Sequence, residues 1–349
     1  MSKDPNKSGT PEPPASGSRE AVLRRKRRVN RIWLIVSLCV TAGLAVGMAA
    51  FLLAIRLPEP LFLEVYADLR PVREQDYGSG VVEWEYALTL PYLTNADDSS
   101  QITGVTFPEL KGDDYRVYCS TTPPAMYSLF SGAASQEVGA YSLRSVYVTI
   151  LRHVPAAEAE GGDDGGAAAS EARTDGADTD PAFQRARIAF SDGREMEAAL
   201  GDVRLGPGGD DAGRTVVYSY SGTTSTDGTT SNLYALEYAL AQTGVFTGAS
   251  VTPAVPDPSL FTVTVNGTPL EALAGDSCSR ILSAHAEFPS PGGIRERLTQ
   301  YALSVDCWIQ DESGGQSCVR LVGLLNHTPQ TPSFMEALSY IRERREGAA

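Results

Sequence analysis

VEWEYALTL, residues 82–90, is the stretch that decides the fold. A large apolar side chain stands at every second position, and glutamate, alanine or threonine stands between. Successive side chains of a β-strand point to opposite faces, so this alternation predicts a strand with one buried and one solvated face. The predicted core face consists of Val82, Trp84, Tyr86, Leu88 and Leu90.

Seven further segments on both sides of this strand have a similar composition, rich in Val, Ile, Thr, Tyr and Phe. Glycine, proline, aspartate and asparagine separate them, as expected for strands joined by turns. Asn266-Gly267 lies between two short apolar runs and predicts a β-hairpin. The predicted strands are residues 61–69, 101–107, 115–119, 143–152, 185–190, 214–220 and 261–266.

The C-terminal part predicts a hairpin followed by a helix. Residues 298–309 and 316–325 alternate and are separated by DESGGQ. Ser333 and Glu336 then have the spacing of a capping box, which predicts a helix over residues 334–345. The secondary structure of residues 233–243 (LYALEYALAQT) is ambiguous, because their composition favours a helix and their alternation favours a strand.

Residues 156–182 interrupt the strand pattern with glycine, alanine, eight carboxylates and no large apolar side chain. Such a segment cannot bury enough surface to fold, so we expect a disordered acidic loop. A long loop adds little closure entropy, so strands at 145–154 and 183–190 are candidates for pairing. A second break at LGPGGDDAGR, near residues 205–214, divides the region into two predicted lobes, 57–205 and 214–349.

Residues 32–55 (IWLIVSLCVTAGLAVGMAAFLLAI) contain no charged residue, histidine, asparagine, glutamine or proline. As a helix this segment is roughly 36 Å long, enough to cross a hydrocarbon layer of about 30 Å. The sequence therefore predicts one transmembrane helix after a disordered basic tail, residues 1–31. The predicted fold class is mainly β (α+β), with this helix followed by two sandwich-like lobes and a C-terminal helix.

A basic run borders the apolar segment on its N-terminal side. Positive charges next to a span favour the cytoplasmic side, so we expect the tail inside and residues 57–349 outside the cytoplasm. The alternatives are a nuclear-localisation or nucleic-acid patch and a cleaved signal peptide. The remaining chain carries 40 Asp/Glu against 20 Lys/Arg, which repels phosphate and argues against nucleic acid. The topology residues are Arg24, Arg25, Lys26, Arg27, Arg28 and Arg31.

Two glycines within the span, Gly43 and Gly47, form a G-x-x-x-G pattern. Small residues at this spacing let two helices approach closely, which makes a homodimer through the span a hypothesis. Small residues are also frequent in single spans, so the pattern has an ordinary alternative.

Four cysteines lie outside the span, and an even number in an exported region suggests disulfides. Cys307 and Cys318 flank the predicted hairpin turn and are expected to face each other. Cys119 and Cys278 are then left as the second pair, across the two lobes. No C-x-x-C or clustered histidine accompanies these cysteines, so we predict neither a metal nor a cofactor.

The sequence offers no familiar arrangement for catalysis. The three histidines are isolated, and the serine-nucleophile, P-loop and dinucleotide-binding motifs are missing. We therefore expect a non-catalytic binding or accessory protein of a cell envelope with a protein partner; the alternative is a surface-anchored hydrolase. Arginine greatly exceeds lysine, which is typical of a GC-rich bacterial genome. Candidate binding aromatics are Tyr77, Tyr92 and Tyr127.

Overall fold

The computed structural model describes the chain from Ser16 to Gly347 with several gaps. The described ranges are 16–78, 80–123, 135–155, 181–207, 214–226, 229–240, 243–289 and 293–347. They form two compact units, Met1–Arg56 and Leu57–Ala349. The first fifteen residues and residues 156–180 of the predicted acidic loop lie outside the described ranges.

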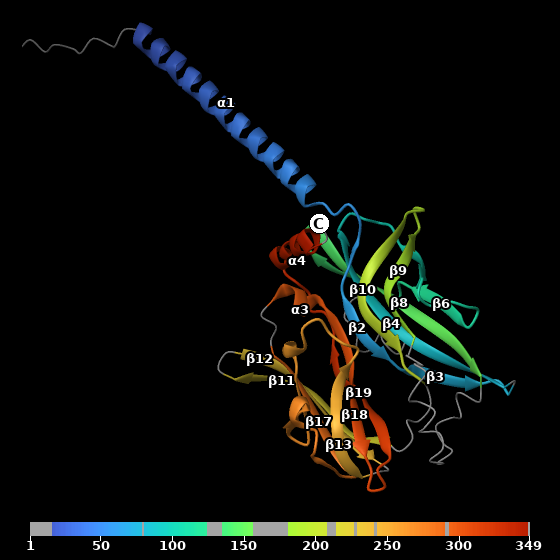
Figure 1. The fold of residues 1–349 in the computed structure, drawn as a ribbon. Coiled ribbons are helices and arrows are strands. Elements are labelled where there is room, and N and C mark those ends of the chain that lie inside the picture. Colours follow the sequence, from blue (N-terminus) through green and yellow to red (C-terminus); the bar gives the residue numbers. More distant parts are fainter. Residues whose placement is uncertain are drawn as a thin grey trace, which may run out of the picture. The chain divides into compact units, whose positions relative to one another are not determined.

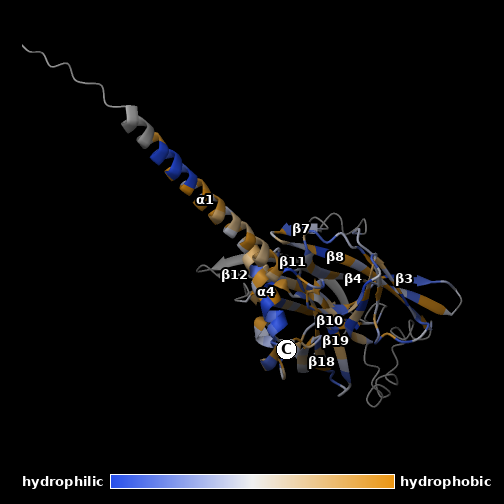
Figure 2. Ribbon diagram, turned by 90° about the horizontal axis from the view of Figure 1, so that it is seen from above, coloured by the Kyte–Doolittle hydropathy of each residue, from blue (hydrophilic) through white to orange (hydrophobic). Residues whose placement is uncertain are grey.

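The first unit is one long helix, α1 (Ser16–Ile55), coloured blue in Figure 1. The part from Leu23 to Ile55 is long and apolar enough to cross a membrane, judged by its length and composition. Figure 2 shows the hydrophilic basic run giving way to the hydrophobic segment along this helix. Helix also covers residues 16–31, which we expected to be disordered, because alanine, leucine, arginine and lysine there favour helix.

The second unit is mainly β, as the alternating patterns predict, and its described strands form three sheets (Figure 1). The six-stranded sheet is built on β4 and β8, which pair antiparallel over fifteen residues each. The stretch VEWEYALTL lies in β4, and its predicted core face is buried. The strands of this sheet are β1 (Leu61–Phe62), β3 (Pro71–Asp76), β4 (Val81–Asn95), β6 (Tyr115–Ser120), β7 (Ser135–Val138) and β8 (Tyr141–Pro155).

The eight-stranded sheet combines strands from both predicted lobes. Its strands are β2 (Val65–Leu69), β5 (Ile102–Thr106), β9 (Ala182–Phe190), β10 (Glu195–Leu205), β13 (Gly244–Thr252), β16 (Ser277–Cys278), β18 (Gln300–Gln310) and β19 (Gln316–His327). Strand β2 pairs parallel with β10 and with β18, and it thereby joins the two halves of the sheet.

The five-stranded sheet has the order β11-β12-β17-β14-β15. Residues 233–243 were ambiguous in the sequence and fall largely in strand β12. Asn266 and Gly267 both have positive φ and turn the chain between β14 and β15, which confirms that predicted hairpin. The strands are β11 (Arg214–Thr226), β12 (Thr229–Leu240), β14 (Thr262–Val265), β15 (Thr268–Pro269) and β17 (Ile281–Pro289).

The two largest hydrophobic cores lie on opposite faces of β2. Val65 and Ala67 belong to the core against the six-stranded sheet, whereas Tyr66 belongs to the core against the five-stranded sheet. All five residues of β2 are therefore buried, as expected for a parallel strand covered on both faces. The first core draws on residues 62–205 and Ala302, and the second on Tyr66 and residues 234–325.

A third, smaller core holds the C-terminal helix α4 (Phe334–Gly347) and the short helix α3 (Ile294–Leu298). The capping box is formed, because Ser333 N–H donates to Glu336 Oε2 at 2.7 Å and Glu336 N–H donates to Ser333 Oγ at 3.4 Å. Phe334 stacks on Tyr141 of β8 with ring centroids 5.9 Å apart. The predicted C-terminal hairpin is also confirmed, as the antiparallel pair β18 and β19.

One predicted pairing is wrong. Strands β8 and β9 flank the acidic segment but lie in different sheets. Strand β4 occupies one edge of β8 along its length, and β6 and β7 occupy the other edge. Strand β9 pairs instead with β10 and β5.

Candidate functional site

The eight-stranded sheet divides at β18. Strand β19 lies along one edge of β18, while the other edge pairs with β2 at residues 300–302 and with β13 at residues 304–310. Strands β2 and β13 must therefore separate close to Ser304, which is fully buried. Such a division leaves backbone and side-chain polar groups inside the protein, and these groups need partners.

A buried network of charged and polar side chains occupies this division. Arg320 donates from Nε to Asp306 Oδ1 and from Nη2 to Asp306 Oδ2, the latter at 3.3 Å. Thr252 donates to the same Oδ2 at 2.6 Å. Asp68 lies 3.5 Å from Arg320 Nη1 and 3.5 Å from Arg70 Nε. Two carboxylates face two guanidinium groups, so the network is neutral and each buried carboxylate has an opposite charge beside it.

The outer face of β13, β18 and β19 continues from this network to the surface. Side chains that share a row in an antiparallel sheet point to the same side, and the register gives the rows. Trp308 lies between Gly248 and Cys318, and Gln310 lies between Val245 and Gln316. The Trp308 side chain is 40% exposed. We name this surface the Trp308 face: Val245, Thr247, Gly248, Trp308, Gln310, Gln316 and Cys318.

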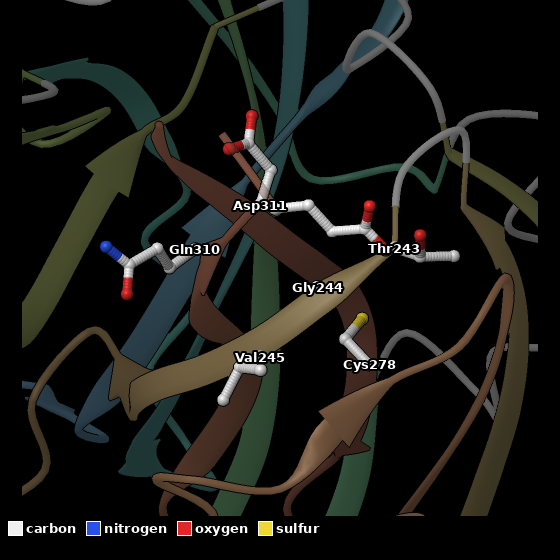
Figure 3. Close-up of a pocket in the computed structure, with 7 residues that line it drawn as sticks. Thr243, Gly244, Val245, Cys278, Gln310 and Asp311 are labelled. Carbon is white, nitrogen blue, oxygen red and sulfur yellow. The ribbon is translucent and has the colours of Figure 1, made fainter. Parts of the chain in front are cut away.

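A shallow depression of about 210 Å³ adjoins the Trp308 face and is shown in Figure 3. It is lined by Thr243, Gly244, Val245, Cys278, Gln310, Asp311 and Glu312. The side chains of Gln310 and Asp311 point in different directions in this view. Asp311 Oδ1 accepts hydrogen bonds from the backbone N–H groups of Ser313 and Gly315, both at 2.8 Å, and serves the β18–β19 turn. Hydrogen bonds from Ser313 and Gly315 hold the pKa of Asp311 below its usual value.

The thiol in this depression is a poor nucleophile. Cys278 is buried, and its thiol donates to the carbonyl oxygen of Ser279 at 3.7 Å. Burial raises the pKa of Cys278, which lowers the thiolate fraction at neutral pH. Burial also raises the pKa of Cys307, to about 12. These environments are typical of cysteines that pack in a core.

The predicted disulfides are absent, since no two described cysteines lie at disulfide distance. Cys307 lies opposite Val319, and Cys318 lies opposite Trp308. The register is thus one residue away from the expected one, so Cys307 points into the second core and Cys318 to the outer face. Cys119 packs against the first core, whereas Cys278 belongs to the second.

The six topology residues and both span glycines are exposed on α1, and the space beside Gly43 and Gly47 is open. Helix pairing remains a prediction. Tyr77 is 56% exposed. Tyr92 is buried, and its ring centroid lies 5.1 Å from that of Phe62. Tyr127 lies outside the described residues.

The start of the β-rich unit is fixed by side chains that the sequence patterns did not indicate. Asn95 Oδ1 accepts from Leu57 N–H at 2.9 Å, and Asn95 Nδ2 donates to the Leu57 carbonyl at 2.8 Å. The Leu57 side chain is buried with Ala337 and Tyr340 of α4. Residue 57 is therefore held by the folded unit immediately after α1 ends.

A second buried ion cluster holds α3 and α4 to the chain that enters this unit. The carboxylate of Glu64 is almost completely buried and accepts from Arg295 Nη2 at 2.8 Å and Nε at 3.2 Å. Arg344 of α4 also donates to Glu64. The buried carboxylate is thus satisfied by two guanidinium groups. No sequence motif marks these residues, which are far apart in the chain.

Searches against protein-family models and against curated proteins find no match for this sequence.

Proposed function

We propose that this chain is a membrane-anchored, extracytoplasmic binding or accessory protein of a bacterial cell envelope. One feature supports the proposal most directly: an apolar helix whose side chains from Leu23 to Ala54 are exposed is followed closely by Leu57, which the folded β-rich unit holds through Asn95. An exposed apolar surface of this length is expected to lie in lipid.

The basic run supports the proposed orientation. Six positive residues lie on the N-terminal side of the apolar segment, and the positive-inside rule assigns that side to the cytoplasm. The acidic, β-rich unit then lies outside. With Leu57 held by Asn95 and α4, the anchor leaves little free chain between itself and the folded unit.

The test is in-cell chemical crosslinking of the tagged full-length protein, followed by purification and mass spectrometry. The proposal predicts stoichiometric recovery of one envelope component, either a membrane protein or a wall polymer. A matched control carries Gly43→Ile and Gly47→Ile, which separates self-association through the span from partner binding. Hydrolysis of wall or lipid material by the purified protein would contradict the proposed non-catalytic function and favour the hydrolase alternative.

A further inference from the structure

The Trp308 face differs from the rest of this acidic chain in its charge. The seven residues include no carboxylate, ammonium or guanidinium group, although 21% of all residues are charged. Charged groups only border the face. Asp306 and Arg320 neutralise each other on one side, and the turn with Asp311 and Glu312 lies on the other. A ligand that binds this face therefore has no charged side chain of the face to complement.

The shape of the face exposes the indole ring. On the neighbouring strands, Trp308 lies opposite Gly248, which has no side chain, and Cys318, which has a short one. A Cβ atom built on Gly248 would lie 3.7 Å from Cε3 of Trp308, so the glycine leaves the ring edge uncovered. Aromatic faces carry partial negative charge and attract polarised C–H groups. The C–H groups on one side of a sugar ring have this character.

Hydrogen-bonding groups surround the ring. Gln310 and Gln316 form the adjacent row, and Gln310 Nε2 donates to the carbonyl oxygen of Gly314 at 3.4 Å, so that its amide oxygen is the group offered to a ligand. Thr247 Oγ1 donates to the carbonyl oxygen of Trp308 at 3.3 Å. Amides and hydroxyls both donate and accept hydrogen bonds. Sugar hydroxyls do the same, so these side chains complement an uncharged sugar better than an anionic or cationic group.

The uncharged part of this sheet face is small. Three strands about 4.8 Å apart and two side-chain rows about 7 Å apart define an area on the order of 150 Å². A stable protein interface buries about 800 Å² on each partner. A surface of this size matches a few sugar rings.

We propose that the Trp308 face binds an uncharged oligosaccharide segment, with sugar rings stacked on Trp308 and hydroxyls bonded by Gln310 and Gln316. This inference rests on the proposed extracytoplasmic location, where envelope polysaccharides are present. The adjoining depression shares Val245 and Gln310 with the face and is bordered by the carboxylates of Asp311 and Glu312.

The experiment uses the full-length protein in lipid nanodiscs, with Trp33→Phe and Trp84→Phe substitutions that leave Trp308 as the only tryptophan. The probes are chitohexaose, cellohexaose and maltohexaose, with hexagalacturonate as an anionic comparison. Trp308 fluorescence is titrated, and calorimetry on the unsubstituted protein repeats the measurement. We expect saturable binding of at least one uncharged probe with a Kd on the order of 0.1–1 mM, and no binding of the anionic one.

Two variants test the site by calorimetry. Trp308→Ala removes the stacking surface. Gly248→Val covers the edge of the indole ring, and because β-branched side chains are favoured in strands, valine should be tolerated at this position. Both should weaken binding at least tenfold with an unchanged fold. Tyr77→Ala removes a more exposed aromatic side chain elsewhere, and this variant should bind as the unsubstituted protein does.

Absence of binding to all three uncharged probes would overturn the inference, and so would unchanged affinity in both site variants. A photo-crosslinker at position 308 that traps a protein in cells would instead identify a protein interface. The proposed extracytoplasmic location is tested separately. If Cys318 lay in the cytoplasm, a membrane-impermeant thiol reagent added outside the cell would not label it. If Cys318 is labelled from outside the cell but none of the uncharged probes binds, only the oligosaccharide inference is overturned.

Discussion

Asn95 is the residue that ties the β-rich unit to the chain leaving α1. Its amide forms one accepting and one donating hydrogen bond with the Leu57 backbone. Asn95→Ala leaves both backbone groups without this partner in a partly buried position. We expect a loss of about 1–3 kcal/mol in the free energy of unfolding, measured by thermal or denaturant unfolding of the full-length protein.

Asn326→Ala is the matched control, because Asn326 is an exposed strand residue and its removal should change stability little. Equal stability of the Asn95 and Asn326 variants would contradict the role assigned to Asn95.

We expect His327 to make the stability of the fold depend on pH. Its ring is buried, with centroids 4.6 Å from Phe288 and 6.2 Å from Tyr301, and burial lowers its pKa from 6.5. The unfolded chain therefore binds the proton more readily than the folded protein. Stability should fall as pH decreases below about 6.5, down to the lowered pKa of the folded state. Denaturant unfolding between pH 5 and pH 7.5 measures this dependence.

His327→Phe removes the titrating group and keeps an aromatic ring, so its stability should change less over the same range. His285→Gln, at an exposed position of β17, should retain the full dependence. A pH dependence that survives in the His327 variant would exclude this residue as its cause.

At the scale of elements, the C-terminal helix depends on one glycine of the β7–β8 turn. Gly139 has a φ of 66°, and a Cβ atom there would lie 2.7 Å from Cδ2 of Phe334. Gly139→Ala therefore combines an unfavourable backbone conformation, about 1–2 kcal/mol, with a clash against α4.

Gly193→Ala separates the two effects. Its φ is 85°, but no atom lies within 4 Å of the added Cβ, so only the backbone cost applies. We expect Gly139→Ala to destabilise the protein by about 1–3 kcal/mol more than Gly193→Ala in chemical denaturation. Similar losses in both variants would show that the Phe334 contact adds nothing.

The division of the eight-stranded sheet depends on Arg320. Arg320→Met removes the guanidinium group that Asp306 and Asp68 face, which should cost about 3–5 kcal/mol of unfolding free energy. Adding Asp306→Asn should restore part of that loss, because one buried charge is removed with its partner. Arg185→Met, at an exposed ion pair of β9, should have no measurable effect. Full stability of Arg320→Met would refute this role.

Local patterns in the sequence predicted those elements that depend on neighbouring residues. The alternation in residues 82–90, the Asn266-Gly267 turn and the Ser333–Glu336 capping box each act within a few residues, and the structure confirms each of them. The β8–β9 pairing was wrong because a strand's partners depend on which other strands reach its edges.

The candidate site was less accessible from the sequence for the same reason. Cys307 and Cys318 seemed suited to a disulfide, but the turn pairs Gln310 with Gln316, and this register places the two thiols on opposite faces. Trp308 stands out only once Gly248 and Cys318 are known to be its neighbours. A tryptophan beside polar residues in the alternating pattern was the available signal.

At the scale of the whole molecule, β2 explains how residues 57–349, for which two lobes were predicted, form one compact unit. Its alternate side chains enter the two cores, and its parallel neighbours belong to different halves of the sequence. The two lobes predicted from residues 57–205 and 214–349 thus share a sheet. We expect this unit to unfold cooperatively, since neither core is complete without β2.

The location of this unit outside the cytoplasm is the central claim, and Cys318 provides a native probe for it. Cys318 is exposed, whereas Cys278 and Cys307 are buried. The decisive measurement treats intact cells that express the Cys119→Ser protein with a membrane-impermeant maleimide, and Cys318→Ser in the same background is the control. The account predicts labelling of Cys318 in intact cells and loss of labelling in the control. Labelling that appears only after the membrane is permeabilised would contradict it.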